Sequence, residues 1–213
     1  MLETRLSFMK IALQSFSAFV ILLAAALLSA AVQAAPEDPR TVVERATNGI
    51  INDLNNLTPE QRTDAEIRRL VMTWIVPAID QQRIAMGALG KHWRRATPEQ
   101  RQAFIDRYRE LQIRTYSGAF KAFNGEQFVF EEVRYNDSGD RALVKGTMQQ
   151  TDGKLVPVDF RLYQRNKTSD WLVYDAIIAG LGMVKTYRDQ LNERLQNISI
   201  DDLLAELAEQ TAD

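Results

Sequence analysis

The side chains that could support catalysis or metal binding in this chain are one histidine and a few aspartates. His92 is the only histidine, and the chain contains no cysteine. A transition-metal site or a nucleophile–base pair needs several such side chains together, and the neighbours Lys91 and Trp93 supply no partner. We therefore interpret His92 as a structural or surface residue and expect no metal site.

Three aspartates could form a carboxylate pair for general acid–base catalysis if the fold brought them together. Asp80 precedes a helical stretch and is expected to cap it. Asp159 and Asp175 alternate with apolar strand residues and are expected at solvent. We predict no catalytic residue and no cofactor, although an enzyme that acts on an apolar substrate through Asp80 or His92 stays open as an alternative.

Two further sequence patterns can be explained without a functional site. Gly180-Leu181-Gly182 follows a predicted strand, but Lys185 occupies the position of the third glycine of a dinucleotide-binding loop and no βαβ unit precedes it. Lys91, Arg94 and Arg95 form the densest basic cluster, which is either a solvated turn or a contact for a phosphate head group or an acidic partner. The formal net charge of −2 argues against a nucleic-acid partner.

The N-terminus is typical of a secretory signal peptide. Arg5 and Lys10 precede an apolar run over 16–32, and Val32-Gln33-Ala34 offers a small-x-small cleavage site. We predict a signal peptide over 1–34 that is cleaved after Ala34, the alternative being an uncleaved anchor. The remainder, 35–213, has the length of a single domain, and without cysteine it has neither disulfides nor a lipidated thiol.

Helical periodicity covers the first half of the mature chain. Thr58-Pro59-Glu60-Gln61 and Thr97-Pro98-Glu99-Gln100 are capping signals, Pro77 and Gly90 are stop signals, and two more helices follow Gly182. The expected inward face of the long helix after Thr97 is the following: Phe104, Tyr108, Leu111, Thr115, Ala119 and Ala122.

Four β-type runs separated by turn-rich loops predict antiparallel hairpins over 128–135, 142–150, 155–163 and 171–178. Pro157 suggests an edge strand or a bulge. Alternation predicts one apolar face: Val144, Met148, Val158, Phe160, Leu162, Leu172, Tyr174, Ala176 and Ile178. The order of helices, meander and helices indicates an α+β fold, in which this face, with Tyr116, Phe120, Phe123, Met183 and Tyr187, either packs as a core or borders a cavity.

The most specific block of the chain resembles one known family. Leu89-Gly90-Lys91-His92-Trp93-Arg94-Arg95-Ala96-Thr97-Pro98-Glu99-Gln100, continued by Phe104 and Arg114-Thr115-Tyr116, resembles the signature of the MlaC family, also called toluene-tolerance auxiliary proteins. The resemblance extends over about 39–209 and includes Asp175 and Tyr187-Arg188-Asp189-Gln190. The chain departs from the family at Gln81, where an aromatic residue often stands, at Gly182-Met183-Val184 and at Leu191.

The resemblance implies a fold and a function. It implies a periplasmic, monomeric carrier in which a strongly curved sheet and its helices enclose an apolar pocket for the acyl chains of a phospholipid. Its implied partners are an inner-membrane ABC transporter complex and an outer-membrane lipoprotein complex, between which the carrier maintains outer-membrane lipid asymmetry. A carrier of another lipid, hopanoid or polyprenyl, is the nearest alternative.

Physical reasoning about such a ligand predicts where it binds. Each CH₂ exposed to water costs about 0.8 kcal/mol, so about 30 methylenes require a shelter of roughly 20 kcal/mol. Only a deep apolar pocket offers that much. The predicted lipid-binding residues are the following: Ile84, Leu89, Tyr116, Phe120, Val144, Met148, Val158, Phe160, Leu162, Tyr174, Ile178 and Met183.

Overall fold

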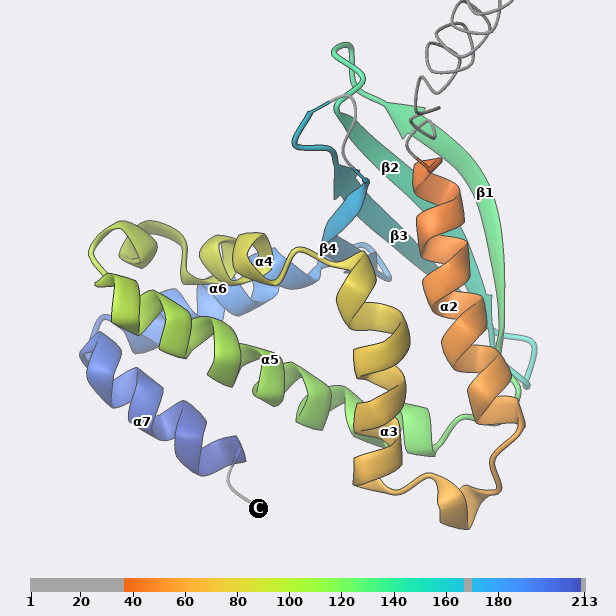
Figure 1. The fold of residues 1–213 in the computed structure, drawn as a ribbon, viewed down its shortest axis with the longest axis horizontal. Helices are drawn as coiled ribbons and strands as arrows, with labels where there is room; N and C mark the ends of the chain where they lie inside the picture. Colours follow the sequence, from red (N-terminus) through yellow and green to blue (C-terminus); the bar gives the residue numbers. More distant parts are fainter. Residues whose placement is uncertain (1–36, 167–169, 212–213) are drawn as a thin grey trace, which may run out of the picture. The chain divides into compact units, whose positions relative to one another are not determined.

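The computed structural model describes residues 37–166 and 170–211, and the predicted signal peptide lies outside them. Helices pack on one side and at one end of an antiparallel sheet (Figure 1). This confirms the predicted α+β class. In chain order the elements are α2 (Pro39–Asn55), η1 (Pro59–Gln61), α3 (Asp64–Leu70), the π-helix η2 (Val71–Ile75), η3 (Val76–Ala78), α4 (Gln81–Leu89), η4 (Gly90–Arg94), α5 (Pro98–Lys121), β1 (Gln127–Tyr135), β2 (Arg141–Gln149), β3 (Leu155–Tyr163), β4 (Leu172–Ile178), β5 (Leu181–Gly182), α6 (Met183–Arg194) and α7 (Ile200–Thr211).

The helix boundaries follow side-chain capping. Thr97 Oγ1 accepts a hydrogen bond from the Gln100 backbone N–H at 3.2 Å, and Gln100 Oε1 accepts one from the Thr97 N–H at 3.0 Å. This reciprocal pair starts α5 as predicted. The similar motif at Thr58 produces only the short turn η1, because α3 begins later with Thr63 as its cap.

The sheet is a meander with the strand order β1-β2-β3-β4-β5, and each pair is antiparallel. The four predicted strands are confirmed, and the short β5 is an addition. β1 bends (Figure 1), and its register with β2 shifts between Phe130 and Val133, which is how a bulge curves a strand. The edge or bulge predicted at Pro157 is wrong, because β3 is interior and its register with β2 is unbroken there. The Pro157 carbonyl accepts from the Ala179 N–H just beyond the end of β4, so the missing N–H falls at the end of a ladder.

A bulge in β4 corrects the predicted apolar face. Arg161 pairs with Asp175 but Leu162 pairs with Val173, so Tyr174 is an extra residue in β4. Because side chains alternate along a strand, one extra residue exchanges the faces beyond it. Val173 therefore joins the helix-covered face. Tyr174 instead lies beside Tyr163, with the ring centroids 5.9 Å apart, so its predicted place on the face of Ile178 is wrong.

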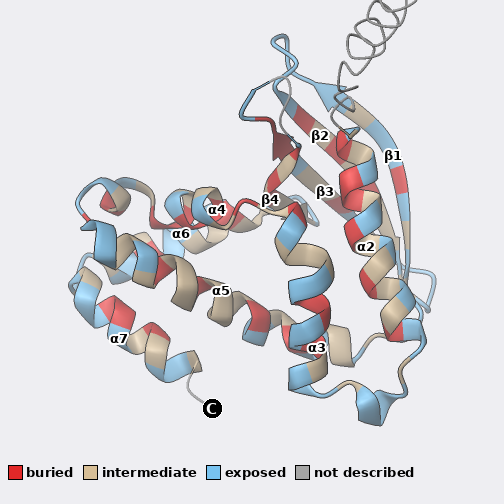
Figure 2. Ribbon diagram, in the orientation of Figure 1, coloured by how far each residue is buried: buried red, intermediate tan, exposed pale blue. Residues whose placement is uncertain are grey.

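Three apolar clusters make up the core. The first joins α4, α5, α6 and α7 around Phe104 and Tyr108. The second lies between α2 and the sheet, where the buried residues of the two elements face each other (Figure 2). The third joins α2, α3, η2 and α5. No helix of the described ranges is both long and apolar enough to span a membrane.

One buried polar atom of the first cluster gives a stability prediction. Tyr108 is 2% exposed and stacks on Phe104, and its hydroxyl has no hydrogen-bond partner among the described residues. An unpaired buried hydroxyl opposes folding, so Tyr108→Phe should raise the free energy of unfolding by about 1 kcal/mol. Urea denaturation measures this change.

Tyr187→Phe is the matched control for that variant. The Tyr187 hydroxyl donates to Tyr116 Oη at 3.4 Å, so its removal should lower stability slightly or leave it unchanged. A clear loss of stability in Tyr108→Phe would mean that its hydroxyl has a partner, and the prediction would be wrong.

Candidate functional site

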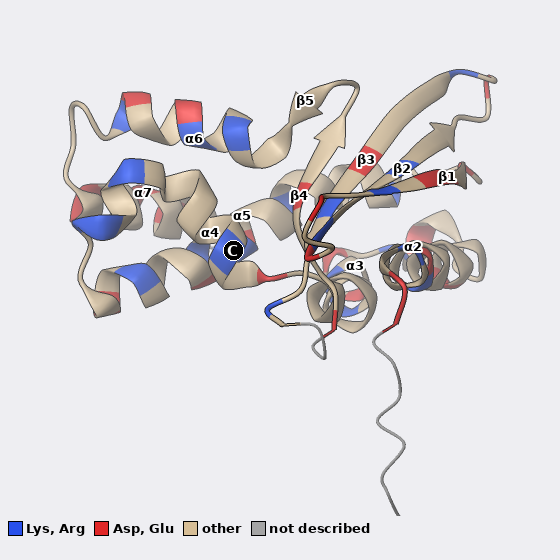
Figure 3. Cartoon of the chain, turned by 90° about the horizontal axis from the view of Figure 1, so that it is seen from above, with Lys and Arg blue, Asp and Glu red and all other residues tan. Residues whose placement is uncertain are grey.

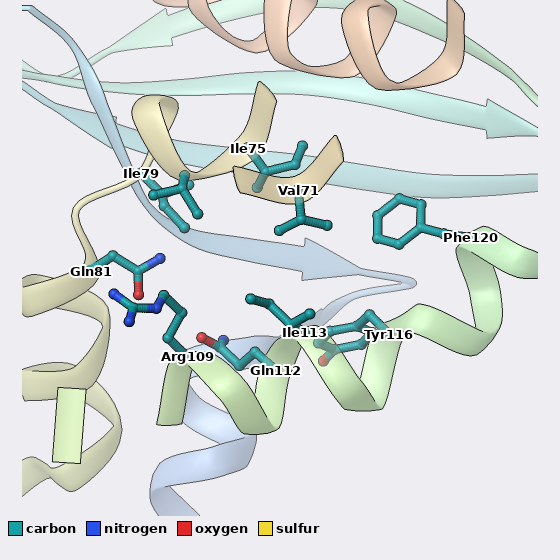
Figure 4. A pocket seen from close by; sticks show the side chains of 10 residues that line it. Val71, Ile75, Ile79, Gln81, Arg109, Gln112, Ile113, Tyr116 and Phe120 are labelled. Atoms are coloured by element: carbon teal, nitrogen blue, oxygen red, sulfur yellow. The ribbon is translucent and has the colours of Figure 1, made fainter. Parts of the chain in front are cut away.

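A cavity of about 200 Å³ lies between the η2–η3 segment and α5 (Figure 4). Its residues come from two stretches that are about thirty positions apart in the sequence, so the fold assembles it from non-local parts. The ten described residues that line it are Val71, Ile75, Val76, Ile79, Gln81, Arg109, Gln112, Ile113, Tyr116 and Phe120.

Local helix geometry presents these side chains to one another. On α5, Arg109, Ile113, Tyr116 and Phe120 follow one another at intervals of three or four residues, which places them on one face of the helix. η2 is a single π-helical turn, a feature that is frequent at functional sites because it widens the helix locally. The cavity thus lies where an irregular turn faces a regular helix.

The inward face of α5 differs from the predicted one in its second half. Phe104 and Tyr108 are buried as expected, but Thr115 and Ala119 are exposed. The first half packs on α4, α6 and α7, while the second half faces α3 and η2, so the buried stripe shifts around the helix. The expectation of one straight apolar stripe is therefore wrong beyond Leu111.

Tyr116 connects the cavity to α6. Its hydroxyl donates to Met183 Sδ at 3.5 Å and accepts from the Tyr187 hydroxyl at 3.4 Å. Burial, and then the hydrogen bond with Tyr187, raises the pKa of Tyr116, so the phenol stays neutral at physiological pH. None of the ten lining residues is acidic. The cavity therefore offers an apolar wall with a few neutral or basic polar groups.

The size of the cavity limits what it holds without rearrangement. An apolar cavity of about 150 Å³ binds one benzene molecule, and sites for drug-sized ligands measure about 300–1,000 Å³. The cavity of about 200 Å³ fits a short apolar segment. A longer chain requires η2 and α5 to separate or the cavity to extend toward the sheet.

The predicted binding residues fall into several environments. Tyr116 and Phe120 line the cavity. The side chains that are packed in the core are Ile84, Leu89, Val144, Val158 and Leu162. The half-buried ones on the helix-facing side of the sheet or next to Tyr116 are Met148, Phe160, Ile178 and Met183.

Sequence reasoning missed eight lining residues. They are Val71, Ile75, Val76, Ile79, Gln81, Arg109, Gln112 and Ile113. The spacing of Arg109, Gln112, Ile113 and Tyr116 was visible as a possible helix face. Nothing in the sequence indicated that the 71–79 stretch stands opposite, because that depends on the tertiary fold.

Asp80 and His92 each have structural partners. Asp80 Oδ1 accepts from the Arg83 N–H at 2.9 Å, so its predicted cap is confirmed, and its Oδ2 accepts from the Tyr163 hydroxyl. His92 is 9% exposed, and its Nε2 lies 3.2 Å from Asn192 Oδ1.

Asp175 is 6% exposed, so its predicted place at solvent is wrong. The start of α6 covers it: Asp175 Oδ1 accepts from the Val184 N–H at 3.0 Å, and Oδ2 accepts from Arg161 Nη1 at 2.9 Å.

The basic cluster lies elsewhere on the molecule. Lys91 and Arg94 border an exposed hollow with Met86, Trp93 and Arg188, and none of these residues lines the apolar cavity. Elsewhere positive and negative side chains are mixed, as along α6 (Figure 3). The surface of α6 thus lacks the single-sign charge of a nucleic-acid-binding helix.

Comparisons with known proteins identify relatives over most of the chain. The family model described as MlaC protein matches residues 44–209. The toluene tolerance protein ttg2D of Pseudomonas putida is 27% identical over 179 residues, which are 83% of this chain and 80% of that protein. The intermembrane phospholipid transport system binding protein MlaC of Haemophilus influenzae is 21% identical over 154 residues, 71% and 72% of the two chains.

A solved structure shares the fold. It is that of a phospholipid-binding protein from Ralstonia solanacearum in complex with a phospholipid, with a TM-score of 0.74 and 28% sequence identity. The similarity covers 82% of this chain and 97% of that one.

Proposed function

The chain belongs to the MlaC family, and we propose on this premise that it binds a phospholipid and carries it between membranes. The observation that carries the proposal is the apolar cavity between η2 and α5, in a fold similar to that of a protein solved with a phospholipid. The names of the two curated relatives support the same function. In this role the chain needs neither a catalytic residue nor a cofactor.

The acyl chains start from the cavity and extend toward the sheet. Tyr116 and Phe120 form its wall, and Met183 next to Tyr116 continues it. Phe160 and Ile178 share the helix-facing side of the sheet and are only half-buried, unlike the packed Val144 and Leu162. A ligand bound in this region would bury apolar surface that is still partly exposed. Each Å² buried would stabilise the complex by about 25 cal/mol.

Family membership supports a proposal for the cellular setting. The carrier works in the periplasm after cleavage of residues 1–34. It receives or delivers lipid at an inner-membrane ABC transporter complex and an outer-membrane lipoprotein complex, and it acts as a monomer. The mixed surface charge and the mainly apolar cavity wall accord with a carrier of lipid rather than of nucleic acid.

Native mass spectrometry of the exported protein tests the proposal. The full chain is expressed, the processed protein is purified without detergent, and its mass is measured before and after extraction with organic solvent. We expect a mass increment equal to one or more phospholipids, which the extract then identifies. A hopanoid or polyprenyl lipid in the extract would replace the phospholipid proposal, and protein that carries no lipid would refute a carrier function.

A further inference from the structure

One end of the apolar cavity gathers polar side chains. Gln81 at the start of α4 and Arg109 and Gln112 on α5 lie together there, while the aromatic ring of Phe120 lies at the opposite end (Figure 4). Gln81 and Gln112 are half-buried, and the Arg109 side chain is 27% exposed, so this end meets solvent. The cavity is thus polar at one end and apolar along the rest.

Several hydrogen-bond donors at the polar end make no hydrogen bond to another described residue. The Arg109 Nε is buried and makes no hydrogen bond within the described part of the chain. Across residues 37–166 and 170–211, the side-chain amides of Gln81 and Gln112 also make none. A buried donor without an acceptor is unfavourable. The exposed part of the Arg109 guanidinium and the two amides would donate to a ligand oxygen placed at this end.

Two carboxylates lie within 4 Å of Arg109 and would compete with an anion, but both are partly neutralised or screened. Asp106 Oδ1 lies 3.4 Å from Arg109 Nη2, and Glu110 Oε1 lies 3.6 Å from Arg109 Nε. Glu110 also binds Arg68 through both carboxylate oxygens. These hydrogen bonds from Arg68 are the first cause that lowers the pKa of Glu110, and Arg68 offsets its charge. Asp106 is 49% exposed, so water screens its attraction for Arg109.

We propose that Arg109, with Gln81 and Gln112, binds the phosphodiester of the phospholipid whose acyl chains enter the cavity. The proposal rests on the proposed function. A guanidinium is always charged and presents a planar set of donors that suits phosphate oxygens, and the two amides add neutral N–H donors. Free phosphate shares this chemistry, but the donors stand at the end of an apolar cavity, where an amphiphile matches both regions.

The test compares two ligands that share the same acyl chains and differ in the phosphoglycerol head group. Lipid-stripped protein is titrated with dioleoylphosphatidylglycerol and with dioleoylglycerol, which has the same chains and no phosphate. We expect wild-type protein to prefer the phospholipid and Arg109→Met to reduce that preference about tenfold. The affinity for dioleoylglycerol should stay unchanged, which also shows that the cavity is intact.

Further variants separate charge, geometry and folding. Arg109→Lys keeps the charge without the planar donors and should recover part of the preference, and Gln112→Leu should lower it less than Arg109→Met does. Arg134→Met, which changes an exposed arginine of β1 outside the cavity, is the control and should match wild type.

Each outcome bears on a specific claim. Equal wild-type affinity for the two lipids, or an unchanged preference in Arg109→Met, overturns the phosphodiester site and leaves lipid binding standing. Binding of neither lipid overturns the proposed function and this inference with it. Inorganic phosphate should not compete with the phospholipid, and if it does, the site binds free phosphate and the head-group assignment is wrong.

Discussion

Ile75→Glu should remove the phospholipid that purifies with the protein and weaken phospholipid binding at least about 100-fold. Ile75 lines the cavity from η2, opposite α5 (Figure 4). An acyl chain at this wall would surround the new carboxylate with methylenes, and an unpaired charge in apolar surroundings costs several kcal/mol, which corresponds to a loss of this size. Lipid phosphorus per mole of protein and a titration with phospholipid measure the two effects.

Met72→Glu is the matched control for this change. Met72 belongs to the same π-helical turn, but its side chain is 40% exposed and does not line the cavity. It should retain lipid at the wild-type level, and thermal unfolding followed by circular dichroism should show that both variants fold. If folded Ile75→Glu keeps its lipid, the acyl chains bind elsewhere and the cavity between η2 and α5 is not the site.

The elements of the fold could be predicted because local signals determine them. Turn residues such as Asn136 and Gly139 separate the strands, and the reciprocal cap at Thr97 starts α5. Each of these signals acts over a few residues, so it is readable without knowledge of the tertiary structure. The resemblance to the MlaC family, which rests on the block around Gly90 and Trp93, then supplied the function that the isolated residues did not indicate.

The faces of the elements were less predictable because they depend on distant partners. The one-residue bulge at Tyr174 exchanges the faces of β4, and no turn or proline marks it in the sequence. Burial of Asp175 depends on the return of the chain through β5, which brings the N-terminus of α6 over the outer side of β4. Alternation alone predicts that the polar residues of a strand face solvent. It cannot show that a helix from later in the chain covers that face.

The lining of the cavity was only partly predictable for the same reason. Tyr116 and Phe120 were predicted because they are aromatic residues on a helix next to an apolar sheet face. Ile75 and Val71 read as ordinary core residues, and only the π-helical turn opposite Ile113 makes them a cavity wall. Lipid contact by sheet residues such as Phe160 stays a prediction. A structure of the lipid-bound protein would test it.

Asp175→Ala should lower the free energy of unfolding by about 2–4 kcal/mol, because the buried carboxylate joins β4, β3 and α6. Its two oxygens accept hydrogen bonds from Arg161 Nη1 and from the Val184 N–H. A hydrogen bond to a charged group contributes about 1.5–3 kcal/mol, and a negative charge at a helix N-terminus adds about 0.3–1 kcal/mol. Arg161 is 47% exposed, so water would hydrate its guanidinium in the variant and offset part of the lost hydrogen-bond energy. Urea denaturation measures the change.

Two further variants test whether the hydrogen bonds of Asp175 cause the expected loss of stability. Asp175→Asn keeps an acceptor for the Val184 N–H but loses the charge, so it should fall between wild type and Asp175→Ala. Asp159→Ala removes a half-buried carboxylate from the neighbouring strand β3 and should change stability by less than about 0.5 kcal/mol. Because α6 carries Met183, which contacts Tyr116 at the cavity, Asp175→Ala should also weaken lipid binding. Equal stability of Asp175→Ala and Asp159→Ala would contradict a structural role for the buried carboxylate.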